Sequence, residues 1–535
     1  MATTGSARTP RAVPDRAGPE GAPKAPSEPT GPGAPGPAGP PGGAPAAPTA
    51  RLRYGYASGS LVTGTFTTLP GLLLLPYLTD TLGVGAALAG AIVFVPKAWD
   101  ALLNPLVGRA SDRTRTRWGA RRPYVLGAGL AMALAFALTF AGLLPGTAGA
   151  WFTAAGYFLT ATAFAFFQVP YVAMPAELAD RDEDRMRLVG GRVAVIGVAA
   201  LVTGAAAPAL VEAGGGGLAG HRWVGVFGAA VIALGALWVF AGTSGAGRSG
   251  RVLESEPGSC RRSPVWPTGP GTHARRVVVG RRRSASPPSS ALRSHAPGPA
   301  GPALRADDAT STTFPSLRRQ FAAARGNPSF MALLRCVVVQ SVATGVLLAG
   351  APYFADHVLH DSAGVGPMVA AFVAPNLLTL PLWSRLRGRR GHALASALFA
   401  AGCLLFLAAP VLPPAAVLAT MALAGTGHAG QLLFLYAMLP ECIADDTART
   451  ERRQAGVLSG LFTTGEGLGV ALGPFLYGLV LQLSGYVSSG TGRAAEQSAT
   501  AELGMLASFA LLPALATAGA VVLLRGYGRT GRRPY

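Results

Sequence analysis

The sequence predicts an all-α membrane protein with twelve transmembrane helices in two six-helix bundles. Half of the 535 residues are hydrophobic, only 13% are charged, and apolar stretches recur along most of the chain. A soluble globular domain carries about 25% charged residues. The low charge content therefore indicates a protein whose ionisable residues lie mainly in loops and at the ends of helices.

Twelve apolar stretches approach the length of about 20 residues that a helix needs to cross a bilayer. They are expected at 55–79, 84–107, 123–144, 151–175, 190–212, 222–242, 329–354, 363–384, 393–411, 414–439, 455–483 and 503–524. They predict one bundle at 51–242 and a second at 329–525. A Pro- and Gly-rich tail at 1–50 and a basic linker at 243–328 are expected to be disordered and cytoplasmic. A short tail at 526–535 is expected to be cytoplasmic.

Charge asymmetry predicts the orientation of the spans, because Lys and Arg are retained on the cytoplasmic side of a membrane. With both termini inside, the cytoplasmic segments carry a net charge of +23, the opposite loops −4 and the spans +1. We therefore expect a multi-pass protein of the plasma membrane with both termini in the cytoplasm.

Internal repeats indicate that the two bundles are homologous. Six positions recur 265 residues later: Tyr171, Pro175, Ala179, Asp180, Arg187 and Gly191 correspond to Tyr436, Pro440, Ala444, Asp445, Arg452 and Gly456. A weaker match at an offset of 276 pairs Pro105, Leu106, Arg109 and Arg113 with Pro381, Leu382, Arg385 and Arg389. Two halves related by an axis along the membrane normal are typical of the major facilitator fold, which we expect here.

Polar residues are concentrated between Lys97 and Pro123. Lys97, Asp100 and Asn104 are spaced i, i+3, i+7 and share one helix face. A charged side chain near the bilayer centre costs about 2.5 to 3.5 kcal/mol, so this face should point inward. Lys97 and Asp100 are then either a structural ion pair between helices or part of a site that couples to a ligand or an ion.

This segment resembles the second helix and following loop of the glycoside, pentoside and hexuronide cation symporters, the melibiose permease branch of the major facilitator superfamily. The matching residues are Lys97, Asp100, Asn104-Pro105, Asp112-Arg113-Thr114, Arg117-Trp118-Gly119 and Arg122-Pro123. The resemblance covers roughly 51–242 and 327–525. It implies a transporter that moves a small solute by alternating access, coupled to a cation.

The resemblance places cation coupling on two acids of the second helix, but the second of these is Asn104 here. An asparagine offers a carbonyl oxygen and cannot titrate. Glu466 stands where the family has a lysine. Burial in an apolar span disfavours the charged form of its carboxyl group. Glu466 therefore either carries a coupling proton or forms a hydrogen bond with a neighbouring helix. The coupling candidates are thus Lys97, Asp100, Asn104 and Glu466, and they favour a proton over sodium.

Substrate contacts are expected from Gln168, Tyr171, Arg192 and Asn376. Gln168 and Gly64 occupy the positions of two sugar-binding acids of the family, and Arg192 matches a family arginine near the cation and substrate region. The Tyr171 ring can stack on a sugar or a flat apolar solute. The alternative for each side chain is an interhelical hydrogen bond.

The loop after the second span is predicted to act in gating through Asp112, Arg113, Arg117 and Arg122. The aspartate can cap a helix N-terminus, and the arginines can reach lipid phosphates or acidic partners such as Glu177 and Asp180. The alternative is that the arginines only fix the topology.

The sequence therefore predicts a secondary active transporter of a small solute, with a sugar or glycoside as the solute that the resemblance implies. The alternative is a proton-coupled exporter of a small metabolite or drug on the same scaffold. An enzyme is not expected, because no nucleophile-and-base pair or metal cluster lies at membrane depth. No cofactor and no nucleic-acid partner are expected, and the protein should act as a monomer in the bilayer.

Overall fold

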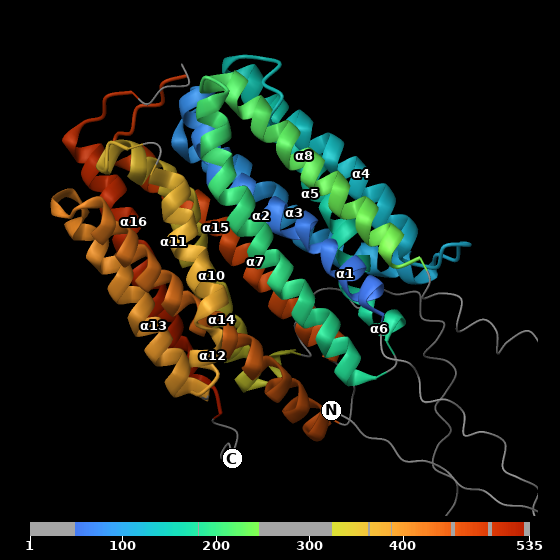
Figure 1. Cartoon of the computed structure of the whole chain (residues 1–535). Helices are drawn as coiled ribbons and strands as arrows, with labels where there is room; N and C mark the ends of the chain where they lie inside the picture. The colour runs from blue at the N-terminus through green and yellow to red at the C-terminus, as the bar shows by residue number, and fades with distance from the viewer. Residues whose placement is uncertain are drawn as a thin grey trace, which may run out of the picture. The chain divides into compact units, whose positions relative to one another are not determined.

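The structure, a computed structural model, describes residues 49–179, 181–244, 324–361, 364–386, 388–450, 455–490 and 495–528. The tails expected at 1–50 and 526–535 and the linker expected at 243–328 lie largely outside these ranges. All the regular structure described is helical (Figure 1).

The N-terminal half contains the first six spans. Its helices are α1 (Ala50–Ser58), α2 (Ser60–Pro76), the π-helical turn η1 (Tyr77–Thr81), α3 (Ala86–Arg113), α4 (Arg122–Thr139), α5 (Gly146–Ala173), α6 (Pro175–Leu178), α7 (Asp182–Ala213) and α8 (Gly217–Gly242). The first span is formed by α1, α2 and η1 together.

The C-terminal half contains the other six spans. Its helices are α10 (Pro328–Tyr353), the π-helical turn η3 (Phe354–Val358), α11 (Val365–Leu378), α12 (Leu380–Trp383), α13 (Gly388–Leu405), the 3₁₀ turn η5 (Phe406–Val411), α14 (Pro414–Thr450), α15 (Ala455–Leu483), α16 (Ala499–Leu523) and the 3₁₀ turn η6 (Leu524–Gly526).

Among the described residues, eleven helical segments are long and apolar enough to cross a membrane, and α11 is a shorter apolar helix of 14 residues. The predicted fold of twelve spans is therefore confirmed. The eighth span, expected as one helix over 363–384, is divided at Thr379 into α11 and α12. Pro381 accounts for this break, because a proline has no N–H to donate to the carbonyl oxygen of residue 377 and its ring crowds that carbonyl group.

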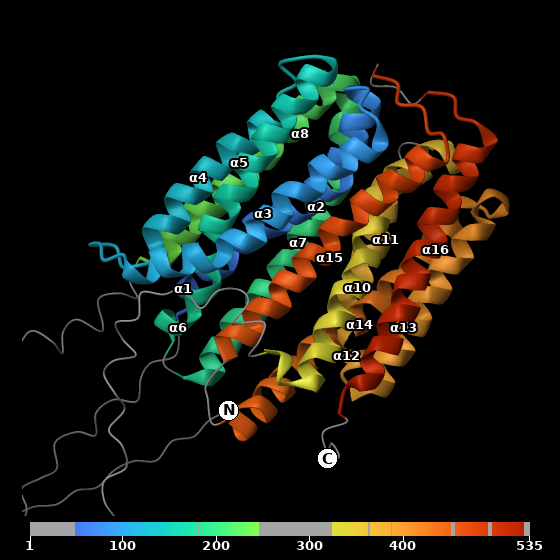
Figure 2. The same cartoon turned by 180° about the vertical axis from the view of Figure 1, so that it is seen from behind.

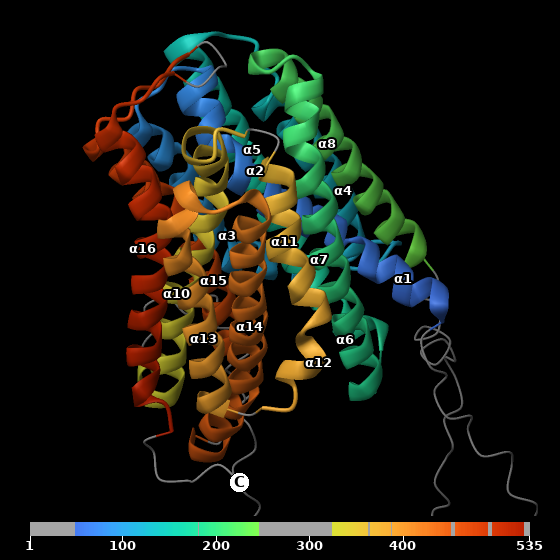
Figure 3. The ribbon, with the colours of Figure 1, turned by 60° about the vertical axis from the view of Figure 1, so that its left-hand side comes forward.

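The contacts between the two halves follow a two-fold pattern. The second span, α3, packs along the eleventh, α15, and the two lie side by side in Figure 2. The fifth span, α7, packs along the eighth, α11, as Figure 3 shows, and α2 packs against α10. When each span is replaced by its equivalent in the other half, the pair of the second and eleventh spans becomes the pair of the eighth and fifth. The pair of the first and seventh spans is unchanged by this exchange. These contacts are those expected of two repeats related by an axis along the membrane normal.

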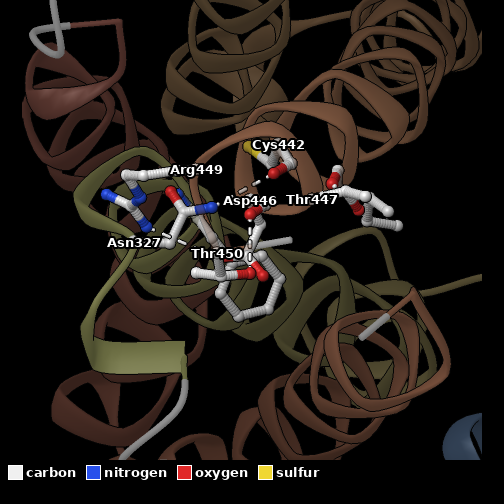
Figure 4. A network of polar contacts seen from close by, with 8 residues as sticks. Asn327, Cys442, Asp446, Thr447, Arg449 and Thr450 are labelled. Atoms are coloured by element: carbon white, nitrogen blue, oxygen red, sulfur yellow. Dashed lines mark hydrogen bonds and ion pairs between the residues drawn. The ribbon is translucent and has the colours of Figure 1, made fainter. Parts of the chain in front are cut away.

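The tenth span continues as a helix well past its predicted end at 439. The Thr450 hydroxyl donates a hydrogen bond to the Asp446 carbonyl oxygen at 2.8 Å, and Arg449 forms an ion pair with Asp446 at 3.4 Å (Figure 4). Asn327 donates to the Cys442 carbonyl oxygen at 3.1 Å. Local hydrogen bonds and a tie to the start of α10 thus keep this polar extension helical.

Glycine allows α10 and α15 to cross with their backbones in contact. A Cβ atom at Gly473 would overlap the backbone of Gly345, and one at Gly345 would overlap the Val470 carbonyl oxygen. Small residues at the crossing are typical of helix packing in membranes. The seventh and eleventh spans are therefore held together by close packing.

We expect Gly473→Ala to destabilise the protein by about 1–3 kcal/mol, the usual cost of overpacking. Gly460→Ala on the same helix is the matched control, because a Cβ atom there meets nothing within 4 Å. The measurement is thermal unfolding of the purified protein in detergent. An unfolding temperature that falls equally for both variants would contradict the proposed role of the crossing.

Candidate functional site

Lys97 lies on α3 and points toward α2 and α5. Its Nζ is 3.5 Å from the centroid of the Phe66 ring and 5.0 Å from that of Phe164. A desolvated cation over an aromatic face gains about 2 kcal/mol. These contacts place Lys97 in the inward direction that the sequence predicts.

Asp100 follows Lys97 by one turn of α3. The two groups interact through their charges, but no ion pair within 4 Å joins these two described side chains. The Oδ1 atom of Asp100 is buried and has no hydrogen-bond partner in the described part of the chain. The carboxyl group therefore has capacity for a proton or a cation, with Asn104 one turn further along.

Gln168 joins α5 to α2, because its Oε1 accepts a hydrogen bond of 2.7 Å from the Thr63 hydroxyl. The neighbouring Gly64 packs against α7: a Cβ atom there would lie 2.6 Å from the Ala199 Cβ and 3.0 Å from the Ile196 carbonyl oxygen. Position 64 therefore has no room for the acidic side chain that the resemblance places on the first span.

Tyr171 is fully buried in the N-terminal half. Its hydroxyl donates to the Tyr56 carbonyl oxygen at 2.8 Å and lies 2.9 Å from the Ser60 hydroxyl. Its ring stacks with Tyr56 and with Phe167, at centroid distances of 4.9 and 5.3 Å. In this conformation Tyr171 packs helices together, and its ring is not accessible to a solute.

Arg192 on α7 faces residues of the other half. Its guanidinium carbon is 5.6 Å from the Tyr171 ring centroid, and its charge acts on Tyr436 and Glu466. Tyr436 on α14 is 46% exposed and donates to Glu466 Oε2 on α15 at 2.6 Å. No ion pair within 4 Å joins Arg192 to Glu466, both of which are described. Opposite charges of the two halves thus face each other without direct pairing.

Other buried polar atoms also lack a hydrogen-bond partner among the described residues, and two of them belong to predicted substrate-side residues: Arg192 Nε and Asn376 Oδ1. The Asn376 amide donates to the Phe372 carbonyl oxygen of its own helix at 3.3 Å. A buried polar group left unsatisfied costs about 1–3 kcal/mol. These atoms are therefore positions at which a polar solute would gain binding energy.

The loop between α3 and α4 is tied to its own half through Arg121 and Arg122. Arg121 forms an ion pair with Glu177 at 3.0 Å and also donates to the Ala173 carbonyl oxygen. Arg122 donates to the Phe240 carbonyl oxygen at 2.6 Å. The predicted contact of the loop with Glu177 is thus made, by Arg121 rather than by the arginines singled out from the sequence.

The other predicted gating residues differ in their surroundings. Arg113 and Arg117 are exposed, and the Arg117 guanidinium lies 4.8 Å from the ring centroid of Trp118. The Asp112 side chain and Asp180 lie outside the described part of the chain.

Hydrogen bonds join the two halves at the end of the molecule where α2 and α10 run into their π-helical turns. The contacts are Thr79 with Tyr353 at 2.7 Å, the Tyr486 hydroxyl to the Asp80 carboxyl group, Ser488 to the Val84 carbonyl oxygen at 2.8 Å and Ser489 to the Asp80 carbonyl oxygen at 2.7 Å. We call these residues the polar latch. Between described residues, no such hydrogen bond joins the halves at the opposite end, so the structure is closed at the latch end.

Tyr486 lies outside the spans and remains a hydrogen-bond donor in the latch. Burial, and next the Asp80 carboxyl group, raise the pKa of Tyr486 far above its usual value. The hydroxyl therefore keeps its proton at physiological pH.

Sequence reasoning did not assign roles to Tyr436, Asp80 or Tyr486. Tyr436 was visible as the repeat equivalent of Tyr171, and Asp80 as an acid at the end of the first span. Nothing local indicated that Tyr486 reaches Asp80, because 406 residues separate them.

Comparison with known proteins identifies the family. The family described as MFS/sugar transport protein matches residues 55–257 and 301–528. This match covers most of the chain, and the protein belongs to that family.

Individual relatives match over shorter segments. The putative glycoside/cation symporter YagG of Escherichia coli K12 is 30% identical over 192 residues, covering 34% of this chain and 40% of the relative. The glucuronide carrier protein homolog of the same organism is 30% identical over 154 residues, covering 28% and 32%. The matched segments therefore span less than half of these relatives.

Solved structures show the same fold. A D-xylose-proton symporter has a TM-score of 0.58 at 12% identity, covering 91% of this chain and 99% of that one. A bacterial homologue of the human lysosomal transporter Spinster, in an inward-facing occupied conformation, has a TM-score of 0.54 at 15% identity, covering 89% and 93%. At these identities the likeness concerns the fold alone.

We expect Tyr486→Phe to weaken the polar latch and to increase the population that is open at this end. Loss of one such hydrogen bond costs about 1 kcal/mol or more, a shift of roughly fivefold in the ratio of the two conformations. Spin labels at Leu144→Cys and Val411→Cys, on exposed turns of the two halves at this end, should then report longer distances.

The control for this experiment is Tyr54→Phe, since Tyr54 is an exposed tyrosine at the start of the first span. Both labelled proteins also carry Cys260→Ser; Cys336, Cys403 and Cys442 are buried. An unchanged distance distribution in Tyr486→Phe would rule out a role for the latch in closure.

Proposed function

We propose that the protein is a secondary active transporter that moves a small solute, a sugar or glycoside, by alternating access with a coupled cation. The observation that carries this proposal is a set of polar groups from both halves at membrane depth, with buried atoms that lack hydrogen-bond partners among the described residues: Asp100, Arg192 and Asn376. Polar groups inside a membrane are costly and are retained where they bind a solute or an ion. Membership of a sugar transport family supports the same function.

The proposed coupling ion is a proton, taken up by Asp100 or Glu466. Asn104 leaves one carboxylate on the second span, and Lys97 already places a positive charge beside it. A bare sodium ion would add charge to this site, whereas a proton neutralises a single carboxyl group without further ligands. Tyr436 holds Glu466 by a hydrogen bond and orients it toward Arg192 of the other half.

The proposed cycle uses the polar latch as one of two alternating barriers. With both termini in the cytoplasm, as the charge asymmetry favours, the latch lies on the outer side and the structure is closed to the outside. Pairing of Arg192 with Glu466 then closes the inner side when the latch opens, because these opposite charges belong to different halves.

The second candidate function is a proton-coupled exporter of a small metabolite or drug. It is favoured by Gly64 and Gln168, because the first position has no room for a sugar-binding acid and the second is hydrogen bonded to Thr63. Efflux driven by an inward proton gradient, without sugar uptake, would favour this function.

We expect purified protein in liposomes to accumulate its solute when a pH gradient is imposed. One pH unit is worth about 1.4 kcal/mol, so one proton per solute supports about tenfold accumulation. A panel of sugars and glycosides, tested in both directions with proton or sodium gradients, identifies the solute. If neither a proton gradient nor a sodium gradient changed the extent of solute accumulation, the secondary active mechanism would be excluded.

Asp100→Asn should abolish gradient-driven accumulation and retain exchange of labelled for unlabelled solute at equal pH. Removing the titratable group uncouples the proton from the solute but leaves the binding site. Glu466→Gln should make accumulation insensitive to pH if Glu466 is the second proton carrier. The control is Asp361→Asn in the exposed turn before α11. Equal loss of accumulation and exchange in Asp100→Asn would instead indicate a structural pair with Lys97.

A further inference from the structure

A groove of about 750 Å³ runs between α4 and α5. These helices lie on the flank of the N-terminal half that faces away from the C-terminal half, as Figures 1 and 2 both show. The groove is hollow because Gly127, Ala131 and Ala163 carry little or no side chain along it, while Leu134 and Leu159 form exposed rims. It opens to the membrane and is separate from the solute site.

The length of this groove suits an acyl chain. From Tyr124 to Leu138 the lining follows 14 residues of helix, about 21 Å at 1.5 Å per residue. One leaflet of the hydrocarbon core is about 15 Å thick, half of the full core. The groove therefore reaches from the edge of one leaflet past the bilayer centre.

The groove begins at a strongly basic loop. Thr114 lines its end and forms a hydrogen bond of 2.8 Å with the Tyr124 hydroxyl. The segment 113–124 contains five arginines and no acidic residue. Arg113, Arg115 and Arg117 are exposed there, whereas Arg121 and Arg122 bind protein groups.

We propose that this groove binds an anionic phospholipid, with one acyl chain between α4 and α5 and the phosphate held by Arg113, Arg115 and Arg117. Arginine matches phosphate oxygens in geometry and charge, and basic residues next to a membrane attract anionic lipid. The bound lipid holds the loop next to the Arg121 to Glu177 ion pair. The occupant is a lipid rather than a helix of another copy, because one end of the groove carries concentrated positive charge.

The test is native mass spectrometry of the full chain with phosphatidylglycerol or phosphatidylcholine of the same acyl chains. We expect bound phosphatidylglycerol to exceed phosphatidylcholine. Gly127→Leu should remove the preferential binding, because the new side chain fills the groove; a Cβ atom there meets nothing within 4 Å, so the helix itself tolerates the change. Ala230→Leu, at an exposed alanine on α8, is the matched control and should bind lipid like the unmodified protein.

A second variant leaves the helix packing unchanged. Replacing Arg113, Arg115 and Arg117 by Gln should weaken phosphatidylglycerol binding roughly fivefold for each arginine removed and leave phosphatidylcholine binding unaltered. Equal binding of the two lipids by the unmodified protein would overturn the proposal. The proposal would also be overturned if Gly127→Leu bound phosphatidylglycerol as well as the unmodified protein does, or if Ala230→Leu lost as much binding as Gly127→Leu. A protein dimer that Gly127→Leu disrupts and Ala230→Leu does not would show that the groove binds a second copy instead.

Discussion

The bilayer interior offers polar groups no hydrogen bonds, and the placement of the polar side chains in both halves follows from this constraint. Lys97 rests on aromatic faces, Tyr171 is hydrogen bonded inside the N-terminal half, and Tyr436 bonds to Glu466. Each of these contacts satisfies a polar group that would have no partner in the lipid interior. Several buried polar atoms of the described residues remain without partners, and three of them belong to Asp100, Arg192 and Asn376, which the sequence also indicates as functional candidates.

Two kinds of contact hold the helices together in this apolar environment: close packing at glycines and hydrogen bonds between polar groups. Within the C-terminal half, the crossing of Gly345 and Gly473 brings two helix backbones into contact. Close packing also joins the two halves, because a Cβ atom at Gly478 of α15 would overlap the Ala86 carbonyl oxygen of α3. Between described residues of the two halves, hydrogen bonds are grouped at the polar latch, and the charge of Arg192 acts on Glu466 without an ion pair. In the proposed cycle, movement of one half against the other exchanges these polar contacts and shifts the close contact between α3 and α15.

Hydropathy and charge predicted the twelve spans and the inward placement of the polar face of α3, because helix formation in a membrane is governed by local composition. Three features were not predictable in this way. The break at Thr379 depends on one proline, the extension of α14 depends on Asn327 and Asp446, and the latch joins residues far apart in the chain. For the site, the sequence indicated charged residues at membrane depth, but it could not show that Tyr436 is the partner of Glu466 or that the substrate-side candidate Tyr171 is buried.

Among the described residues, the polar latch has no counterpart in the other repeat, and this asymmetry affects the kinetics of the proposed cycle. Tyr486, Ser488 and Ser489 of the latch belong to the long connection between α15 and α16, whereas the equivalent connection between α7 and α8 is only 214–216 and is made of glycines. In the proposed cycle the two conformations therefore differ in free energy, and the one that is closed at the latch is the more stable. A carrier with such a resting bias cannot change the final solute distribution, but its half-saturation concentrations differ between the two faces of the membrane.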